Sequence, residues 1–540
     1  MRGRALTTSS KRRLYALWMV LIAGFAVLHA LNLRADFPNH SPWMFDWAKY
    51  TDEGWYSNAA VRAHLFGHWY QPGDFNPATA VPLWPFLEWV LFFFTGVTIE
   101  AARGLAVGCF FLSLLLSYTL LRANHSNKPR WIPLLALTLI VTSPFLYCFS
   151  RLAILEPLLT TLTLAALNLA ARLPRMRRPV CASAGIGLLF TLMVLTKTNA
   201  LFLLPAVAWA ILLPLWQRRA VAVRCALAAA CASLFSFAAW MTLVASLGLL
   251  RDFKYYFFVN KYFKPPEFYW PLLSFWWSSN GLLWVDHILV PLAALATLAA
   301  MLAWRSRWGR KLLLDPVFGA SVWVIAGLVL FMTYQNHPQP RYYALAAFFC
   351  FILVALAAGA LVENAPAGAA PKNTWPRRIG LAAVGLAVAA AGINGIWTLN
   401  YATHPEFTFV DAARSLTRYI DEHPNGRRLL VSISGDQVSL VTHLPVLCDD
   451  MGTQDLAGKL AAYQPGWFAT WNDLDPGTLE DIHNHFSLEQ VAGFRAFDHP
   501  ERNLLVLFKL HPLPPGQKLD PSLQNLQEPL PEDKIDIPIE

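Results

Sequence analysis

The sequence predicts a mainly α-helical, polytopic membrane protein that carries a small α/β domain near its C-terminal end. Of its 540 residues, 56% are hydrophobic and only 14% are charged, which is unlike a soluble globular chain. Long apolar runs recur, many of them long enough to cross about 30 Å of hydrocarbon at about 1.5 Å rise per residue. After residue 400 these runs stop, and short polar and apolar segments alternate instead.

The apolar runs, taken with their flanking charges, predict about eleven membrane spans. Their approximate bounds are 14–33, 102–121, 131–149, 153–171, 180–196, 199–216, 223–249, 284–303, 317–334, 342–361 and 379–397. The first run has no small-residue cleavage site after a short core, so we expect a retained anchor and not a signal peptide. A shorter apolar stretch at 82–94 fits a span, a re-entrant helix or a surface-lying helix.

The distribution of positive charge predicts the orientation. Lys and Arg are concentrated in residues 1–13 and after the second, fourth, sixth, eighth and tenth spans. Because cytoplasmic loops are enriched in Lys and Arg, we expect a multi-pass protein of the plasma (inner) membrane with a cytoplasmic N-terminus. The net charge of +9 follows from this pattern, so it indicates membrane lipids and not nucleic acid as partners.

Two long connections then face outside. The first, residues 34–82, is dense in Trp, Tyr and Phe, which is typical of interfacial helices at the headgroup level. The second, residues 251–286, combines lysines with aromatics on the side where cations are disfavoured. An anionic headgroup is the explanation that we favour for these lysines.

The C-terminal region differs from the membrane part. Helix-like patterns at 411–422 and 456–463 alternate with strand-like patterns at 428–433, 467–471 and 504–510, and Gly435-Asp436 is predicted as a turn. We therefore expect an extracytoplasmic α/β domain over 401–512. The tail, 513–540, is rich in Pro, Asp and Glu and is predicted to be disordered.

Cofactor motifs are sparse. The seven cysteines lie mainly inside apolar runs without a CxxC pair, so neither a disulfide framework nor a zinc site is indicated. No phosphate-binding glycine loop opens a helix, which gives no support to an ATP-driven mechanism. We predict no metal ligands, and the sequence leaves open whether a divalent metal is needed.

The acidic pair Asp52-Glu53 lies in the first outer loop. On a helix, Asp52 and Tyr56 are neighbours at i and i+4, whereas Glu53 points elsewhere. A carboxylate in a dry site can act as a general base toward an acceptor hydroxyl. The alternative is a solvated loop acid or a charge that favours a helix N-terminus.

Arg151 and Glu156 form a second constellation, at the outer start of the fourth span. Charges at the bilayer edge are costly without a partner, so both residues are candidates for the site, and an internal Arg–Glu pair is the alternative. Lys197 interrupts an apolar hairpin at its outer end, where it could hold a phosphate or extend its ammonium to the interface.

The run His337 to Tyr343 supplies the last candidates. Arg341 precedes a span on the side where arginine is disfavoured, and its planar fork suits a pair of phosphate oxygens. An interface anchor built from Arg341 and Tyr342 is the alternative. His337, Tyr342 and Tyr56 are candidate substrate contacts.

All these residues are expected on the outer face, which favours chemistry on a lipid-linked, charged substrate. A membrane transporter or lipid flippase for an anionic lipid-linked substrate is the rival class. It would place charges near the bilayer midplane and show paired repeats, and neither pattern is evident. A scaffold protein would not need outer arginines.

The ordered motifs resemble glycosyltransferase family 39, which includes protein O-mannosyltransferases and lipid A aminoarabinose transferases. The resemblance covers residues 14–400 and is carried by DEGWY at 52–56, SRLAILEP at 150–157, Lys197 and PRYY at 340–343. It implies a GT-C membrane catalytic domain and a sugar donor linked to polyprenyl phosphate or diphosphate. Transfer would be inverting, to an acceptor hydroxyl on a protein, glycan or glycolipid.

The same resemblance implies roles for single residues. Asp52 matches the acid that orients or deprotonates the acceptor, with Glu53 beside it supporting the loop, and Glu156 matches a second catalytic acid. Arg151, Lys197 and Arg341 would bind the donor phosphate. One departure is the absence of a Lys-Pro-Pro run before the second span, where this chain has residues 79–83 as TAVPL. That absence argues against a lipid A acceptor and an aminoarabinose donor.

Overall fold

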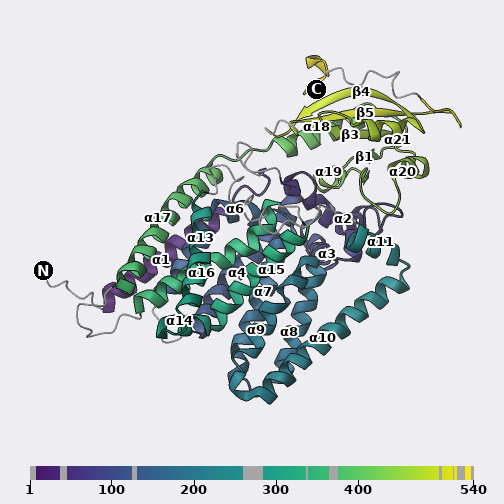
Figure 1. Cartoon of the computed structure of the whole chain (residues 1–540). Helices are drawn as coiled ribbons and strands as arrows, with labels where there is room; N and C mark the ends of the chain where they lie inside the picture. The colour runs from purple at the N-terminus through teal and green to yellow at the C-terminus, as the bar shows by residue number, and fades with distance from the viewer. Residues whose placement is uncertain are drawn as a thin grey trace.

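A bundle of long helices is joined at one end to a smaller domain built on a sheet (Figure 1). The computed structural model describes residues 8–36, 46–124, 130–259, 284–335, 339–363, 375–497, 502–514, 516–519 and 530–536. The bundle helices are α1 (Thr8–Leu28), α4 (Ile99–Asn124), α5 (Trp131–Thr142), α6 (Pro144–Ser150), α7 (Leu155–Arg172), α8 (Pro179–Thr196), α9 (Leu204–Leu212), α10 (Arg219–Ser246), α13 (Trp284–Leu302), α14 (Arg307–Leu313), α15 (Pro316–Gln335), α16 (Ala344–Glu363) and α17 (Trp375–Thr403). The predicted mainly α fold class is confirmed.

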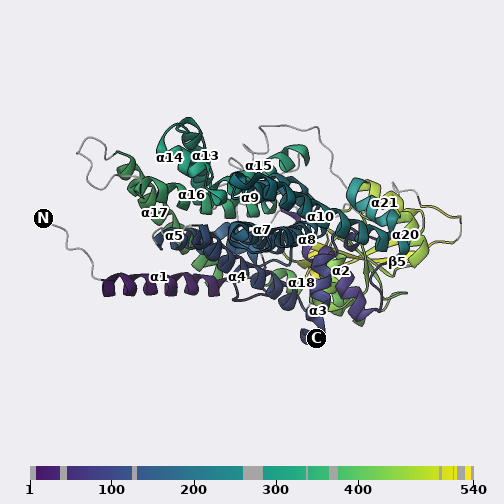
Figure 2. The ribbon, with the colours of Figure 1, turned by 90° about the horizontal axis from the view of Figure 1, so that it is seen from below.

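Three helices occupy the region between the bundle and the sheet domain: α2 (Asp52–Leu65), α3 (Leu83–Thr95) and α11 (Leu250–Lys254). Helix α1 runs along one edge of the bundle, and it contacts α5 (Figure 2). Of these, α2 lies in the predicted first outer loop, α3 coincides with the apolar stretch at 82–94, and α11 lies at the start of the second long loop.

Six helices of the described part are long and apolar enough to cross a membrane, namely α4, α8, α10, α15, α16 and α17. The bent pair α5–α6 would make a seventh. All eleven predicted ranges overlap helices, but α1, α7 and α9 are not among the helices that pass this test of length, hydropathy and charge. The chain is thus a multi-pass membrane protein, and the count of eleven spans stays a prediction.

The α5–α6 pair bends by 70° at Ser143-Pro144. Proline has no N–H for the preceding turn and restricts the residue before it to extended backbone, which Ser143 adopts. The Ser143 hydroxyl accepts a hydrogen bond of 3.1 Å from the Leu146 N–H and so caps α6. The bend directs the chain toward the loop that carries Arg151.

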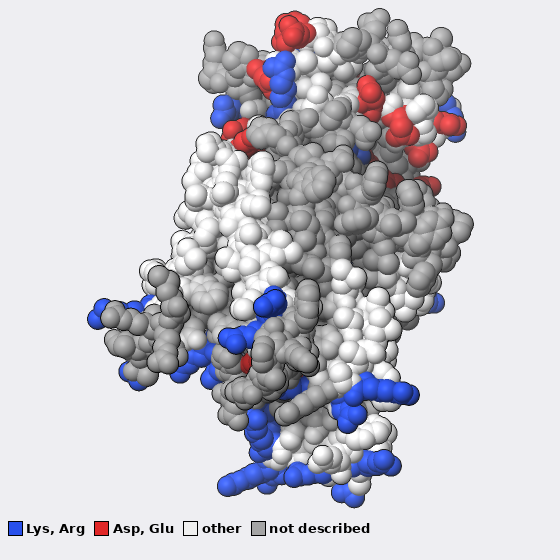
Figure 3. Space-filling model, turned by 60° about the vertical axis from the view of Figure 1, so that its left-hand side comes forward, with Lys and Arg blue, Asp and Glu red and all other residues white. Residues whose placement is uncertain are grey.

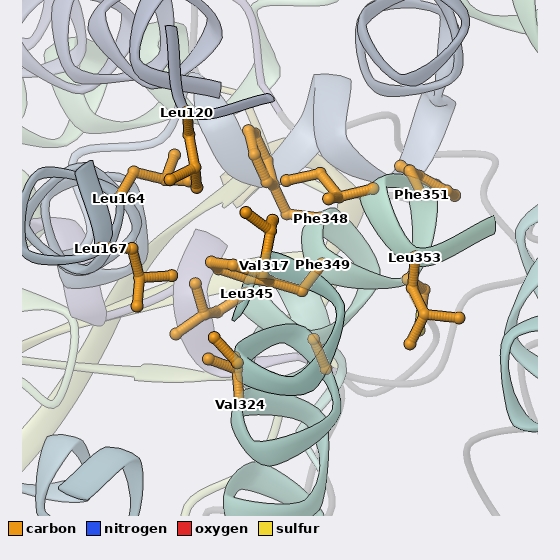
Figure 4. Close-up of a cluster of buried hydrophobic side chains, with 14 of the residues drawn as sticks. Leu120, Leu164, Leu167, Val317, Val324, Leu345, Phe348, Phe349, Phe351 and Leu353 are labelled. Carbon is orange, nitrogen blue, oxygen red and sulfur yellow. The ribbon is translucent and has the colours of Figure 1, made fainter. Parts of the chain in front are cut away.

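Helix α16 forms the centre of the bundle, and every residue from 344 to 360 is buried. Leu345, Phe348 and Phe349 of α16 pack against α4, α7 and α15 (Figure 4). By contrast, only 11% of the apolar window of α10 is buried, as expected for a helix with a lipid-facing surface. The core therefore lies inside the bundle.

The sheet domain contains α18 (Thr408–Glu422), β1 (Leu430–Val431), α19 (Gly435–Thr442), β2 (Val446–Leu447), α20 (Leu456–Tyr463), β3 (Trp467–Trp471), α21 (Pro476–His483), β4 (Phe486–Arg495) and β5 (Leu504–Pro512). Its strands are ordered β2-β1-β3-β5-β4, with β1 parallel to β2 and β3, and β5 antiparallel to β3 and β4.

Successive residues of β3 alternate between the two faces of this sheet. Trp467, Ala469 and Trp471 pack with α18, whereas Phe468 packs with α20 and α21 on the other face. Tyr50, from the loop after α1, is completely buried in the first of these clusters and packs edge-on against Trp471. The first loop therefore contributes to the core of the sheet domain.

Three details of the C-terminal region differ from expectation. Gly435-Asp436 is not a free turn but the first turn of α19, because an acid there is favoured by the helix dipole. Within the tail that is predicted to be disordered, the described residues 530–536 contact β4 through a bridge between Gly493 and Ile535. A third difference is β4, which the sequence analysis does not predict and which pairs antiparallel with the next strand, β5.

Charges are separated along the molecule. On the face in Figure 3, Lys and Arg gather at the end of the bundle that lies away from the sheet domain, while Asp and Glu appear mainly near the sheet domain. Where the surface between them is described, it is mostly free of charged residues in this view.

Candidate active site

Helix α2 begins at Asp52 and carries both acids of the predicted pair in its first turn. An acid at this position is favoured by the helix dipole, yet Asp52 is only 1% exposed and Glu53 is completely buried. Because adjacent helical residues point in different directions, the two carboxylates have different partners.

Asp52 faces Arg341, which lies in the short helical turn before α16. The Arg341 Nε atom is 2.8 Å from Asp52 Oδ2, an ion-pair distance. Arg341 is also bound to Asp46, through its backbone N–H at 2.9 Å and its guanidinium at 2.7 Å. Arg341 therefore lies between two carboxylates. Asp46 is not among the predicted site residues, because its only sequence signal is an acid in an aromatic-rich loop.

Glu156 and Lys197 form a second ion pair beside the first. Glu156 is in the first turn of α7, and Lys197 follows the last residue of α8. Both are buried, so Lys197 does not extend to the interface, and Glu156 pairs with Lys197 and not with Arg151. In the described part of the chain, the second oxygen of Glu156 has no hydrogen-bond partner.

The ring of Tyr342 connects the two pairs. Lys197 Nζ lies 4.5 Å and Arg341 Cζ lies 4.9 Å from its centroid, both within cation–π range. Tyr56, one helical turn after Asp52, lies beside Tyr256. The structure thus brings together six predicted residues: Asp52, Tyr56, Glu156, Lys197, Arg341 and Tyr342.

Burial raises the pKa of Asp52 to about 6. The positive charges of Arg341 and Lys197 act in the opposite direction, whereas the negative charges of Asp46 and Glu156 raise this pKa further. A carboxylate whose pKa lies near neutrality can both accept and release a proton, which is what general acid–base chemistry requires.

Glu53 is outside this cluster. Its Oε1 atom accepts hydrogen bonds from Arg103 at 2.7 Å and the Ala153 N–H at 2.8 Å. Its Oε2 atom accepts from Arg103 at 2.7 Å and Gln437 at 2.9 Å. This carboxylate connects α2, α4, the loop before α7 and the sheet domain.

Arg151 is also separate from the Asp52 cluster. Its guanidinium donates to the Leu31 and Asn32 carbonyls, which follow the end of α1, and to the Tyr147 hydroxyl. It lines a cavity of about 280 Å³ near the end of α17. The structure therefore does not place Arg151 beside Lys197 and Arg341. His337 lies outside the described residues.

In the ranges that the structure describes, no group of three or more His, Cys, Asp or Glu side chains could hold a metal ion.

The chain is thus a helical membrane bundle with a partly helical loop after its first helix and a buried acid on that loop, and the fold is of the GT-C class. Solved structures have this same fold. ArnT from Cupriavidus metallidurans, in the apo state and bound to undecaprenyl phosphate, matches with a TM-score of 0.56 at 14% and 15% identity. Both matches cover 91% of this chain and 98% of theirs.

The Archaeoglobus fulgidus oligosaccharyltransferase, in a complex with zinc and sulfate, matches with a TM-score of 0.50 at 12% identity. The match covers 90% of this chain and 72% of the oligosaccharyltransferase chain. No protein-family model and no curated protein matches the sequence. The chain has the GT-C fold, as its motif order predicts, and at these identities the comparisons establish the fold alone.

Proposed function

We propose that this protein is an integral membrane glycosyltransferase that moves a sugar from a polyprenyl-phosphate donor to an acceptor hydroxyl. One observation carries the proposal: on a GT-C fold, four distant segments contribute two buried acid–cation pairs around Tyr342. ArnT, which has the same fold, has been solved with undecaprenyl phosphate bound, and this supports a lipid-linked donor.

In the proposed reaction, the acceptor oxygen attacks the anomeric carbon while Asp52 takes its proton. The bond between that carbon and the phosphate oxygen breaks on the opposite side, with inversion. Arg341 and Lys197 are placed to hold the negative charge that develops on the leaving phosphate. Their carboxylate partners keep both cations oriented before the donor binds, so little reorganisation is needed.

The charge distribution supports an orientation for this reaction. Lys and Arg gather at the end of the bundle opposite the sheet domain (Figure 3). By the positive-inside rule, that end and the N-terminus are cytoplasmic, and the Asp52 cluster faces the extracytoplasmic side of the plasma (inner) membrane. Residues 401–512 would then form an extracytoplasmic domain near the acceptor, which is a protein, glycan or glycolipid.

The test is donor turnover by purified protein in nanodiscs with a panel of radiolabelled polyprenyl-phosphate sugars. Because general base catalysis contributes about 10²–10⁴-fold, we expect Asp52→Asn to lower turnover of the accepted donor by at least about 100-fold. Asp421→Asn, which removes an exposed acid of α18 paired with Arg428, is the matched control and should behave as wild type. Turnover at the wild-type rate by folded Asp52→Asn would contradict the assignment of Asp52 as the general base.

A further inference from the structure

The face of α2 opposite Asp52 is bound along its length by the sheet domain. The residues involved recur every four positions along the helix: Gly54, Asn58 and Arg62. Residues spaced by four share one helix face, while Asp52 and Tyr56 lie on another. One face of α2 is thus directed to the sheet domain and the other to the ion pairs.

The contact nearest Asp52 is made by Gln437 of α19. Its Oε1 accepts a hydrogen bond of 2.7 Å from the Gly54 N–H, and its Nε2 donates one of 2.9 Å to Glu53. The first N–H groups of a helix have no partner within the helix, and the N-cap residue Thr51 makes no side-chain cap. Gln437 therefore caps α2 from a position 383 residues away in sequence.

Further along α2, Asp436 accepts from Asn58 at 3.1 Å and pairs with Arg62 at 3.2 Å. Arg62 also pairs with Asp74 at 2.7 Å, and Asp74 lies 3.2 Å from Lys459 of α20. These charged side chains are all buried. They hold the sheet domain on α2 independently of Gln437.

Before Asp52 in the sequence, Tyr50 is inserted into the core of the sheet domain. The centroid of its ring lies 5.6 Å from that of Trp471 and 4.8 Å from that of Phe497. Asp52 is therefore held on both sides in the chain by contacts to this domain. The rotation of α2 about its axis, which sets the direction of the Asp52 carboxylate, depends on these contacts.

We propose that the sheet domain is a positioning element of the active site and that Gln437 is its positioning residue for Asp52. The expected loss of activity rests on the proposed function, whereas the expected loosening of α2 does not. Gln437 is completely buried and lies behind α2, so it acts through Glu53 and Gly54. A domain that only collected acceptors would not need to cap the helix of the base.

The test replaces Gln437 by Met, which keeps the volume and removes both hydrogen bonds. Amide hydrogen exchange of peptides from the first turns of α2 should become at least tenfold faster, with α7 and α8 unchanged. With the accepted donor, kcat should fall by at least tenfold, with a much smaller change in the donor KM. Gln490→Leu, on β4 and away from α2, is the control and should match wild type in both measurements.

Gln437→Glu separates the two bonds, since a carboxylate can still accept from Gly54 but meets Glu53 with like charge. We expect intermediate exchange in α2 and a lowered kcat. Exchange in α2 at the wild-type rate in both folded variants would overturn the proposal, whatever the enzyme transfers. If no donor is turned over by the wild-type protein, the proposed function fails, while the exchange result still decides whether Gln437 holds α2.

Discussion

At the scale of single residues, the chemistry of Asp52 depends on the charges that surround it. Burial raises its pKa to about 6, and the nearby acids Asp46 and Glu156 raise it while Arg341 and Lys197 lower it. A base must be deprotonated to accept a proton, so activity should fall as the pH drops through the pKa of Asp52.

We therefore expect the acidic limb of the pH–rate profile to have its midpoint near pH 6 in the wild-type enzyme. Asp46→Asn removes a negative charge that raises the pKa of Asp52, so the limb should move to lower pH. The measurement is kcat for the accepted donor across the acid and neutral range. Asp421→Asn should leave the limb in place, and a shift of the Asp46→Asn limb to higher pH would contradict the electrostatic argument.

At the scale of elements, α2 is notable for a glycine inside its first turn. Glycine in a helix interior costs about 0.5–1 kcal/mol relative to alanine, so another interaction must require it. A Cβ at Gly54 would lie 2.1 Å from Gln437 N and 2.3 Å from the Asp436 carbonyl carbon, both of them backbone atoms of α19. The close approach of α2 and α19 therefore depends on Gly54.

Gly54→Ala should destabilise the protein by about 1–3 kcal/mol, the usual cost of overpacking, despite the better helix propensity of alanine. It should also lower transfer activity, because α19 must move away from α2. Thermal unfolding in detergent and donor turnover are the two measurements. In α4, a Cβ at Gly108 meets nothing within 4 Å, so Gly108→Ala is a matched control that should be neutral or mildly stabilising. Equal behaviour of the two variants would refute the packing argument.

At the scale of the whole molecule, the bundle and the sheet domain are connected by buried charges. A buried ion pair is weak evidence for stability in itself, but removal of one partner leaves an uncompensated charge in a dry interface. The Arg62 side chain is 4% exposed and faces Asp74 and Asp436, whereas the Arg428–Asp421 pair on the surface is about half exposed.

Arg62→Met should therefore cost about 3–5 kcal/mol of unfolding free energy. Arg428→Met, the same substitution in an exposed pair, should cost at most about 1 kcal/mol. Denaturant-induced unfolding of the purified proteins, followed by tryptophan fluorescence, measures both. Similar losses in the two variants would show that the interface charges do not hold the domains together.

The sequence by itself determined the membrane class, the location of the long apolar helices of the bundle and most of the candidate residues. Hydropathy, flanking charge and short motifs are local properties, so they can be read along the chain, and the GT-C fold predicted from the motif order is confirmed. The strands at 467–471 and 504–510 were predictable for the same reason, because their apolar runs are continuous.

Only the tertiary structure decided which acid meets which cation. Glu156 pairs with Lys197 and not with Arg151. Arg341 pairs with both Asp46 and Asp52. Glu53 accepts hydrogen bonds from Arg103 and Gln437. These partners are 41 to 384 residues apart, and helical periodicity carries no information over such separations. The attachment of α2 to the sheet domain was unpredictable for the same reason, because it depends on how two segments far apart in the sequence pack together.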